Sequence, residues 1–427
     1  MAISIGNYDA AKQEFVDRLN AKVSTSIPFI QKRVNLGKGQ IVKGSRSNAI
    51  IQLYVPAAGN ASVATVSGPN ASDSALDLTD RSRVSSFYKV ECYAQNASDI
   101  LQYSGFEEIF KLDDVKRDLI IPRGQRIANE IERDLVERNW FRSGGAVISS
   151  TASFAALAQV SAILQSVKAV GDFTGYISPM LQSLLANSVT NGSVYFLPNE
   201  IVNKMYGKAS IGVFHNCTWV NEPFMPELTF GSAWSGVTVS TDITDSGTST
   251  IYLEGLPAGD TIYAGTPFYI DGVYDVTISG VKQGNLKKWF IVQETITATG
   301  TKDAVTVVPI YFNGDDGYMN NLWVAADDDG AYKIASGTAV TCGLTEGHTY
   351  YTGLVRDTDA FNWTPFEWPD VHALDNTKSV TDELTIQVVT GGEILDRSNV
   401  MRLDVPYFGD IVDTRAVRTL YIDTTES

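Results

Sequence analysis

Residues 122–142 read PRGQRIANEIERDLVERNWFR, and this stretch sets the organisation of the chain around it. Ile127, Ile131 and Leu135 recur at every fourth position, which predicts a helix with one narrow apolar side. The other sides carry charges of both signs, so most of the helix surface meets water. Such a helix acts as a strut that buries one side rather than as the wall of an active site.

The sequence also indicates the ends of this helix and its charge pairs. Pro122 suits a first helical turn, and Gly144 with Gly145 supplies the stop. Opposite charges one turn apart contribute about 0.2–0.5 kcal/mol per pair to helix stability. The expected pairs are Arg126–Glu130, Arg133–Glu137 and Asp134–Arg138.

A second amphipathic helix is predicted from about Tyr8 to Val23, ending before Pro28. A single short helix cannot bury an apolar stripe by itself. It therefore docks either on the core of its own domain or on a neighbouring chain. The apolar stripe consists of Ala11, Phe15, Leu19 and Val23.

Residues 35–90 follow as an extended segment that glycines interrupt repeatedly. Its part from 57 to 74 consists almost entirely of small residues and can hold little core. A long segment of this kind inside a globular chain is usually either disordered or held by a partner. The residues alone are compatible with both outcomes.

A small α/β layer comes next, and a β-rich region interrupts it. Residues 153–168 predict a buried helix, residues 194–197 a buried strand and residues 198–205 another helix. From residue 237 to 339, short β segments alternate with Gly-, Asp- and Pro-containing turns, which predicts a compact barrel or sandwich. The α/β pattern resumes near Tyr350.

Three strand candidates close the chain, at Leu384–Thr390, Val400–Val405 and about Val417–Ile422. Because chain of the host domain lies on both sides of the β-rich region, residues 233–346 are interpreted as an insertion. We expect this insertion to fold by itself.

The chain is acidic, with 33 Lys and Arg against 49 Asp and Glu and a net charge of -16. Residues 1–50 carry eight basic and three acidic residues, whereas residues 146–427 carry 14 basic and 32 acidic ones. Opposite fields on one chain favour head-to-tail association of copies, although a solvated acidic surface with a basic tail has the same pattern. A dedicated nucleic-acid binder is excluded because it needs clustered Lys and Arg. Neither a signal peptide nor a membrane span is expected.

Residues that could carry chemistry are sparse. The three cysteines, Cys92, Cys217 and Cys342, fit a reducing compartment rather than a disulfide framework. Cys217 lies two positions from His215, but a structural cysteine beside an ordinary histidine is the favoured interpretation. The acidic run at 327–329 lacks the spacing of a calcium loop and is interpreted as a solvated turn. With no metal, nucleotide or nucleophile motif in the sequence, we expect no enzyme, no cofactor and no metal site.

The order of these elements resembles a known family. The resemblance is carried by LVERNWF at 135–141, YFLPNE at 195–200, GLPAGDTI at 255–262 and the strands that end in PYFG within 384–409. The chain is similar to the major capsid proteins of tailed phages, which have the Hong Kong 97 phage fold. Within that family it resembles the coat proteins of short-tailed phages of the phage P-22 type, which carry an insertion domain.

The resemblance implies an α+β fold with an N-terminal arm, an extended E-loop, a P-domain with a spine helix, an A-domain and an inserted small β-barrel, the I-domain. The implied boundaries are 1–35 for the arm, 36–90 for the E-loop, 91–150 for the P-domain with its spine helix, 151–232 and 347–383 for the two parts of the A-domain, 233–346 for the I-domain, and 384–427 for the P-domain strands and C-terminal segment.

The resemblance also implies a structural protein of the virion. Copies would assemble as hexamers and pentamers, with a scaffolding protein, into an icosahedral procapsid in the cytoplasm of a bacterial host. The shell would enclose double-stranded DNA, packaged through a portal protein, without sequence-specific binding and without a membrane, and a decoration protein is a further expected partner. Contacts with other subunits or with scaffold are expected at Glu14, Phe15, Asp17, Leu19, Lys38 and Lys43.

Two other classes of protein remain as alternatives. A β-rich tail protein or adhesin would bind a host glycan on exposed aromatic rings, although core and interface positions are the favoured interpretation of these residues. The rings concerned are Trp289, Trp323, Trp363 and Trp368. A glycoside hydrolase would need two positioned carboxylates, one with a raised pKa, and no local pattern indicates them.

Overall fold

The computed structural model describes residues 13, 16–21, 23, 40–42, 50–56, 87–104, 121–167, 169, 172–190, 211–278, 281–312, 320–327, 330–366, 375–380, 384–393 and 398–425. The chain divides into two compact units, each of which gathers segments that are far apart in the sequence. Unit 1 consists of residues 1–53, 91–139 and 361–412, and unit 2 consists of residues 54–90, 140–360 and 413–427.

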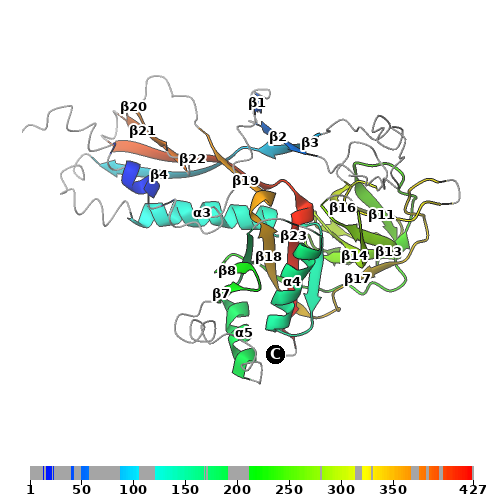
Figure 1. The fold of residues 1–427 in the computed structure, drawn as a ribbon. Helices are drawn as coiled ribbons and strands as arrows, with labels where there is room; N and C mark the ends of the chain where they lie inside the picture. Colours follow the sequence, from blue (N-terminus) through cyan, green and yellow to red (C-terminus); the bar gives the residue numbers. More distant parts are fainter. Residues whose placement is uncertain are drawn as a thin grey trace, which may run out of the picture. The chain divides into compact units, whose positions relative to one another are not determined.

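Unit 1 contains a long antiparallel sheet with helix α3 (Ile121–Asn139) packed along it, as Figure 1 shows. The helix predicted over 122–142 is confirmed, and it ends three residues earlier than expected. Its apolar side, formed by Ile127, Ile131 and Leu135, is buried. The strands of the sheet are β4 (Gln95–Ser104), β19 (Phe361–Pro365), β20 (Asp375–Val380), β21 (Thr385–Glu393) and β22 (Ser398–Ile411).

Strand β22 is the centre of this sheet. Its residues 398–407 pair with β4 along one edge, while the other edge pairs first with β21 and then, over 407–411, with β19. Strand β20 pairs with β21 and completes the order. The length of β22 gives α3 a continuous surface on which to pack.

The helical residues 16–21 dock on the sheet of their own unit. The side chain of Asn20 donates through Nδ2 to the carbonyl oxygens of Ser379 and Leu384, both at 3.1 Å. The described part of this helix therefore buries its apolar side in its own chain rather than against a neighbouring one. The residues that it buries are Val16, Leu19, Asn20 and Val23.

Unit 2 is built on a mixed seven-stranded sheet with the strand order β5-β23-β18-β6-β8-β7, and β9 pairs with β18. The helix predicted over 153–168 is confirmed as α4 (Phe154–Ser166), which is capped by Ser153. The second helix of this unit is α5 (Pro179–Thr190). The strands are β5 (Ala146–Ser149), β6 (Phe173–Ile177), β7 (Gly212–Phe214), β8 (Cys217–Asn221), β9 (Glu227–Thr229), β18 (Thr349–Asp357) and β23 (Val417–Asp423).

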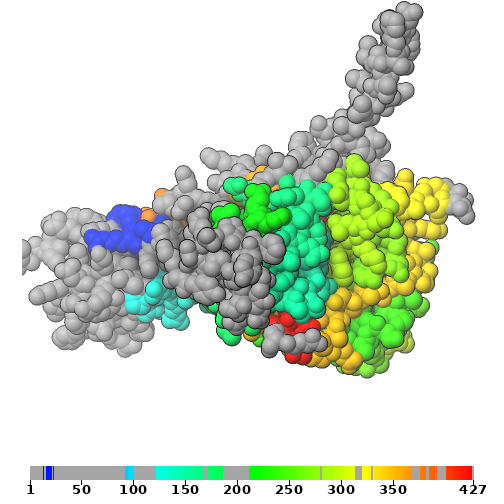
Figure 2. Space-filling view, turned by 60° about the horizontal axis from the view of Figure 1, so that its bottom comes forward, coloured from blue at the N-terminus to red at the C-terminus, as the bar shows by residue number. Residues whose placement is uncertain are grey.

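The inserted module, residues 233–346, also belongs to unit 2. It has a hydrophobic core of its own, to which Ile251, Phe268 and Leu322 contribute fully buried side chains. In Figure 2 its residues, coloured green to yellow, form one continuous mass of atoms. Its strands are β10 (Thr238–Val239), β11 (Thr248–Glu254), β12 (Thr261–Ile262), β13 (Pro267–Val276), β14 (Lys282–Ile291), β15 (Ile296–Thr297), β16 (Asp303–Ile310) and β17 (Val340–Cys342).

The expectation of a closed β-barrel in this module is wrong for the described residues. Their strands form three separate sheets, in the orders β10-β11-β16, β12-β15 and β14-β13-β17. Strands β12 and β15 are only two residues long, and register shifts interrupt the β13–β14 pairing after Tyr269. Strands this short and irregular do not continue one hydrogen-bonded ladder around a barrel, so the core is enclosed by small sheets instead.

Three strands lie in a different unit from the one that the expected boundaries give them. Strand β23, expected with 384–427 in the P-domain, pairs with β18 in the sheet of unit 2. Strand β5, expected with 91–150, pairs parallel with β23 in that same sheet. Strand β19, expected with 347–383 in the A-domain, pairs with β22 in unit 1. A local pattern predicted β23 alone of these three strands, and a pattern along one strand does not identify its partner.

The segment expected to be extended contributes a three-stranded sheet of β1 (Gln40–Val42), β2 (Ile50–Pro56) and β3 (Phe87–Tyr93). The strand predicted at 194–197, the helix predicted at 198–205, and Ala11 of the N-terminal stripe lie outside the described residues.

Candidate functional site

The possible thiol–imidazole pair is explained by a tight turn. His215 and Asn216 are the two central residues between β7 and β8, with φ of 49° and 61°. A two-residue hairpin turn with both φ values positive matches the twist of the flanking strands and suits Asn. His215 Nδ1 lies 2.7 Å from Ser161 Oγ, and Cys217 is fully buried. The position of His215 is therefore structural, as the sequence favoured.

Other candidates for chemistry also have ordinary structural surroundings. Asp327, at the start of the acidic run, pairs with Lys333 at 3.0 Å and accepts a hydrogen bond from the backbone of Ala331. Within the described residues no group of three or more His, Cys, Asp or Glu could hold a metal ion. In that same part of the chain, no helix is long and apolar enough to cross a membrane. The three cysteines are free thiols.

Of the six residues expected to contact other subunits or scaffold, two are described. Leu19 is fully buried within the chain, so it serves packing. Asp17 is exposed and accepts a 3.0 Å hydrogen bond from Gln13 Nε2. The other four, Glu14, Phe15, Lys38 and Lys43, lie outside the described residues.

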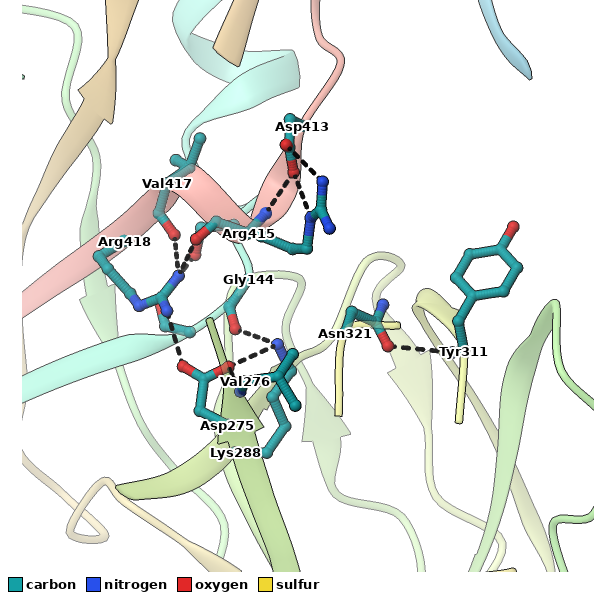
Figure 3. Close-up of polar contacts among 12 residues, drawn as sticks. Gly144, Asp275, Val276, Lys288, Tyr311, Asn321, Asp413, Arg415, Val417 and Arg418 are labelled. Atoms are coloured by element: carbon teal, nitrogen blue, oxygen red, sulfur yellow. Dashed lines mark hydrogen bonds and ion pairs between the residues drawn. The ribbon is translucent and has the colours of Figure 1, made fainter. Parts of the chain in front are cut away.

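Unit 2 contains a buried ionic junction between the inserted module and the seven-stranded sheet (Figure 3). Asp275 of β13 lies between two cations: Arg418 of β23 at 2.6 Å and Lys288 of β14 at 3.5 Å. Lys288 Nζ also donates to Gly144 O at 2.6 Å. All three charged side chains are nearly inaccessible to water. The junction joins the last strand of the chain, the segment after α3 and the module.

A second ion pair extends the junction. Arg415 makes a bidentate pair with Asp413 and also donates through Nη1 to Ile278 O at 2.8 Å. The backbone N–H of Ile278 in turn donates to Val167 O at the end of α4. Both backbone polar groups of Ile278, just after β13, are thus bonded to the host: the N–H to the end of α4 and the carbonyl to Arg415.

A hydrogen bond and a close ring contact at Gly265 complete the attachment. Tyr421 of β23 donates its hydroxyl to Gly265 O at 2.5 Å. Gly265 has a φ of +92°, and a Cβ at this position would lie 2.0 Å from the Trp140 ring. Only glycine fits there, because the conformation and the space both exclude a side chain.

The electrostatics of the junction are those of a structural contact rather than of a catalytic site. Burial lowers the pKa of Lys288, an effect that Asp275 opposes and the nearby Arg418 reinforces. Breaking a buried charge pair by removing one partner typically costs about 3–5 kcal/mol, because the remaining charge stays uncompensated. The arrangement fixes the orientation of the module on its host.

Unit 1 contains a polar anchor between α3 and β22. Arg138 pairs with Asp134 at 2.8 Å and with Asp410 at 3.1 Å. Tyr407 donates its hydroxyl to Asp134 at 2.6 Å. Burial raises the pKa of Tyr407, and the adjacent Asp134 raises it further. Next to them, Asn139 accepts a hydrogen bond from the backbone of Ile411.

The other end of α3 is anchored as well. Arg123 pairs with Asp99 of β4 at 2.6 Å, and Arg126 approaches the same carboxylate at 3.7 Å. Arg126 was expected to pair with Glu130, but the structure pairs Glu130 with Arg133. The helix is therefore fixed to the sheet at both ends, through β4 near its start and β22 near its end.

The tryptophans of the glycan-binding alternative do not form an exposed platform in the described residues. Trp363 is fully buried and stacks on Tyr407 with ring centroids 5.0 Å apart. Trp289 and Trp323 lie on the inserted module, each against a tyrosine ring. Trp368 lies outside the described residues.

Sequence analysis missed the residues of the ionic junction. Asp275 and Arg418 are 143 positions apart, and no local spacing relates them. The available signal was weaker: Asp275 and Lys288 each occupy a position that faces inward in an otherwise alternating strand. A charge at such a position needs a buried partner.

Comparison with known proteins finds no matching family model and no matching curated sequence. Solved structures do resemble the chain. The capsid of the cyanophage P-SCSP1u is similar with a TM-score of 0.40 and 10% identity, over 91% of this chain and 86% of that one. The acidic stable capsid of the Helicobacter pylori bacteriophage KHP30 is similar with a TM-score of 0.40 and 10% identity, over 88% and 85%. A virus-like particle from Pyrococcus furiosus is similar with a TM-score of 0.35 and 7% identity, over 95% and 99%.

Proposed function

We propose that this chain is the major capsid protein of a tailed phage and that many copies build an icosahedral shell. The observation that carries the proposal is the α3 strut, which is fixed at both ends to a sheet of long strands. A helix held in this way is a rigid strut along the sheet. That property suits a shell subunit better than an enzyme.

The organisation of unit 2 supports the same function. Its sheet has the inserted module attached through buried charges, so the module keeps a fixed orientation on its host. Among the described residues no metal cluster accompanies this arrangement. We propose that the module is the insertion domain of a P-22-type coat protein.

The finer assignments belong to the same proposal. Copies form hexamers and pentamers, a scaffolding protein directs their assembly in the bacterial cytoplasm, and a portal protein admits double-stranded DNA. A decoration protein is a further partner. The acidic body, with its excess of 32 acidic over 14 basic residues in 146–427, suits a wall that does not grip the DNA it encloses.

Sedimentation of the expressed chain tests the proposal against its main alternative. A coat protein co-expressed with its scaffold moves as large particles through a sucrose gradient. A glycan-binding tail protein stays monomeric or trimeric and is retained on immobilised host polysaccharide. Small species that bind polysaccharide would replace the proposed function with the alternative.

The scaffold contact has a test of its own. Asp17 is exposed on the N-terminal helix, whose buried side is already occupied. Charge reversal, Asp17→Lys, should lower the scaffold content of procapsids if a basic scaffold segment binds there. The matched control is Asp172→Lys, which reverses an exposed carboxylate in unit 2. Equal scaffold content in both variants removes Asp17 from the contact.

A further inference from the structure

We propose that one face of the inserted module binds an acidic surface of a second copy of this chain. The face, named the lysine–aromatic face, consists of Tyr269, Tyr274, Lys282, Lys287 and Trp323. The inference rests on the proposed function, because it assigns a contact between shell subunits to particular side chains.

Backbone pairing brings these side chains together. Tyr274 of β13 is paired across strands with Lys287 of β14. On its other edge Tyr274 exchanges two backbone hydrogen bonds of 2.9 Å with Trp323. Directly paired residues on neighbouring strands project from the same side of a sheet. Trp323, Tyr274 and Lys287 therefore form a row across three adjacent segments.

The two ammonium groups lie against aromatic rings. Lys282 Nζ is 3.8 Å from the centroid of Tyr274 and 4.1 Å from that of Trp323. Lys287 Nζ is 3.7 Å from the centroid of Tyr269. A lysine held over a ring has already lost much of its side-chain freedom, so binding an anion there costs less entropy.

The charges on this face are available to a partner. Within the described residues, no carboxylate forms an ion pair with Lys282, and Lys287 has only a 3.6 Å contact with the exposed Asp271. Two other lysines of the module are engaged: Lys288 in the ionic junction and Lys333 with Asp327. The lysine–aromatic face is thus a cationic patch on an acidic chain, and aromatic rings are enriched at protein interfaces.

A second copy of this chain supplies the complementary charge. Residues 146–427 carry 32 acidic against 14 basic residues. Elsewhere on the module, Asp242 and Asp245 between β10 and β11, and Glu254 at the end of β11, are exposed. A contact between a cationic face of one copy and an acidic face of the next is heterologous, and heterologous contacts build rings when the rotation between copies closes.

Charge reversal in the full chain tests the inference. The variant combines Lys282→Glu with Lys287→Glu, and a second, milder variant combines Lys282→Gln with Lys287→Gln. The matched control is Lys302→Glu, because the Lys302 ammonium lies over the Tyr252 ring of β11 in another sheet of the module. It is compared with the single variant Lys287→Glu, so that both change the net charge of the module by the same amount. Sedimentation velocity over a range of protein concentrations, at low and high salt, gives the concentration of half-association, and thermal melting reports folding.

We expect the reversal to raise the concentration of half-association at least tenfold, the glutamine pair and the single variant Lys287→Glu to raise it less, and the control to match the original chain. High salt should weaken association of the original chain more than that of the glutamine pair. Association of the reversal variant at the original concentration overturns the inference. If the reversal variant does not melt cooperatively, the glutamine pair decides in its place, and an unchanged concentration for that pair overturns the inference as well.

The outcomes separate this inference from the proposed function. Closed particles from both the original chain and the reversal variant leave the coat-protein assignment standing and remove the contact. Lysine-dependent association into species that never close leaves the contact standing and contradicts the coat-protein assignment. An original chain that does not associate overturns the contact, and co-expression with scaffold then decides the coat-protein assignment separately.

Discussion

Arg418 and Asp275 form a buried ion pair of 2.6 Å across 143 positions of sequence. Arg418 belongs to the final strand of the chain, and Asp275 belongs to the inserted module. Lys288 shares the same carboxylate at 3.5 Å, so one anion serves two buried cations. The pair therefore makes attachment of the module depend on a strand that is far away in the sequence.

Replacement of the shared carboxylate should destabilise unit 2 strongly. Asp275→Asn leaves Arg418 and Lys288 buried without their counter-charge, and we expect a loss of about 3–5 kcal/mol in the free energy of unfolding. Urea denaturation followed by fluorescence measures it. Asp271→Asn on the same strand is the control, because Asp271 is exposed and its loss should cost less than about 1 kcal/mol. Equal losses of unfolding free energy in the two variants would contradict the role of Asp275 as the counter-charge of the junction.

The contact of α3 with β22 should not tolerate a methyl group at Gly409. A Cβ there would lie 2.4 Å from Leu135 and 3.3 Å from the Trp363 ring. Gly409→Ala should therefore cost about 1–3 kcal/mol through overpacking. Gly231→Ala is the control, since no atom lies within 4 Å of the position a Cβ would take. Thermal melting of both variants gives the comparison, and a melting temperature unchanged by Gly409→Ala contradicts the packing described.

Alkaline pH should weaken the anchor of α3 through Tyr407. Burial raises the pKa of this phenol, and Asp134 raises it further. Below about pH 10 the phenol is neutral in both the folded and the unfolded chain. Above that pH the unfolded chain releases a proton that the folded chain retains, so stability falls by up to about 1.4 kcal/mol per pH unit.

Tyr407→Phe removes this contribution to the pH dependence. The variant should be less stable near neutrality by about 1–2 kcal/mol, because Asp134 loses a donor. Its stability should then fall less steeply between about pH 10 and 11, measured by urea unfolding. Tyr252→Phe, at an exposed ring, serves as the control. An alkaline slope that Tyr407→Phe leaves unchanged would contradict the assignment.

The inserted module should fold when it is expressed alone as residues 233–346. Its core draws only on residues within these limits, including the fully buried Ile251 and Phe268. Isolation exposes Asp275 and Lys288 to water, which removes the cost of burying Lys288. A dispersed amide spectrum by nuclear magnetic resonance is the expected result. A collapsed spectrum would mean that the module needs its host sheet to fold.

Periodicity was sufficient to predict the helices that bury one side. Ile127, Ile131 and Leu135 identified α3, and residues 153–168 identified α4, because helical spacing is a local property of the chain. In the N-terminal helix the described buried side also includes Asn20, which the predicted apolar stripe did not contain and which donates hydrogen bonds to the backbone of the sheet. A polar side chain at a buried position is invisible to a hydrophobic pattern.

Local sequence patterns could not predict the strand partners or the ionic junction. The strand near Val417 was predicted correctly, but its place between β5 and β18 depends on residues far away in the sequence. Asp275 and Lys288 likewise form the ionic junction only together with Arg418, which lies far away in the sequence. The closed barrel was overpredicted because strand-like composition does not reveal how short β12 and β15 are.

Electron microscopy of the full chain co-expressed with its scaffold tests the central claim most directly. Closed particles with icosahedral symmetry, whose subunit density contains a long helix lying along a sheet, are the predicted result. Dispersed monomers or trimers in every field, from protein that melts cooperatively and is therefore folded, would contradict it.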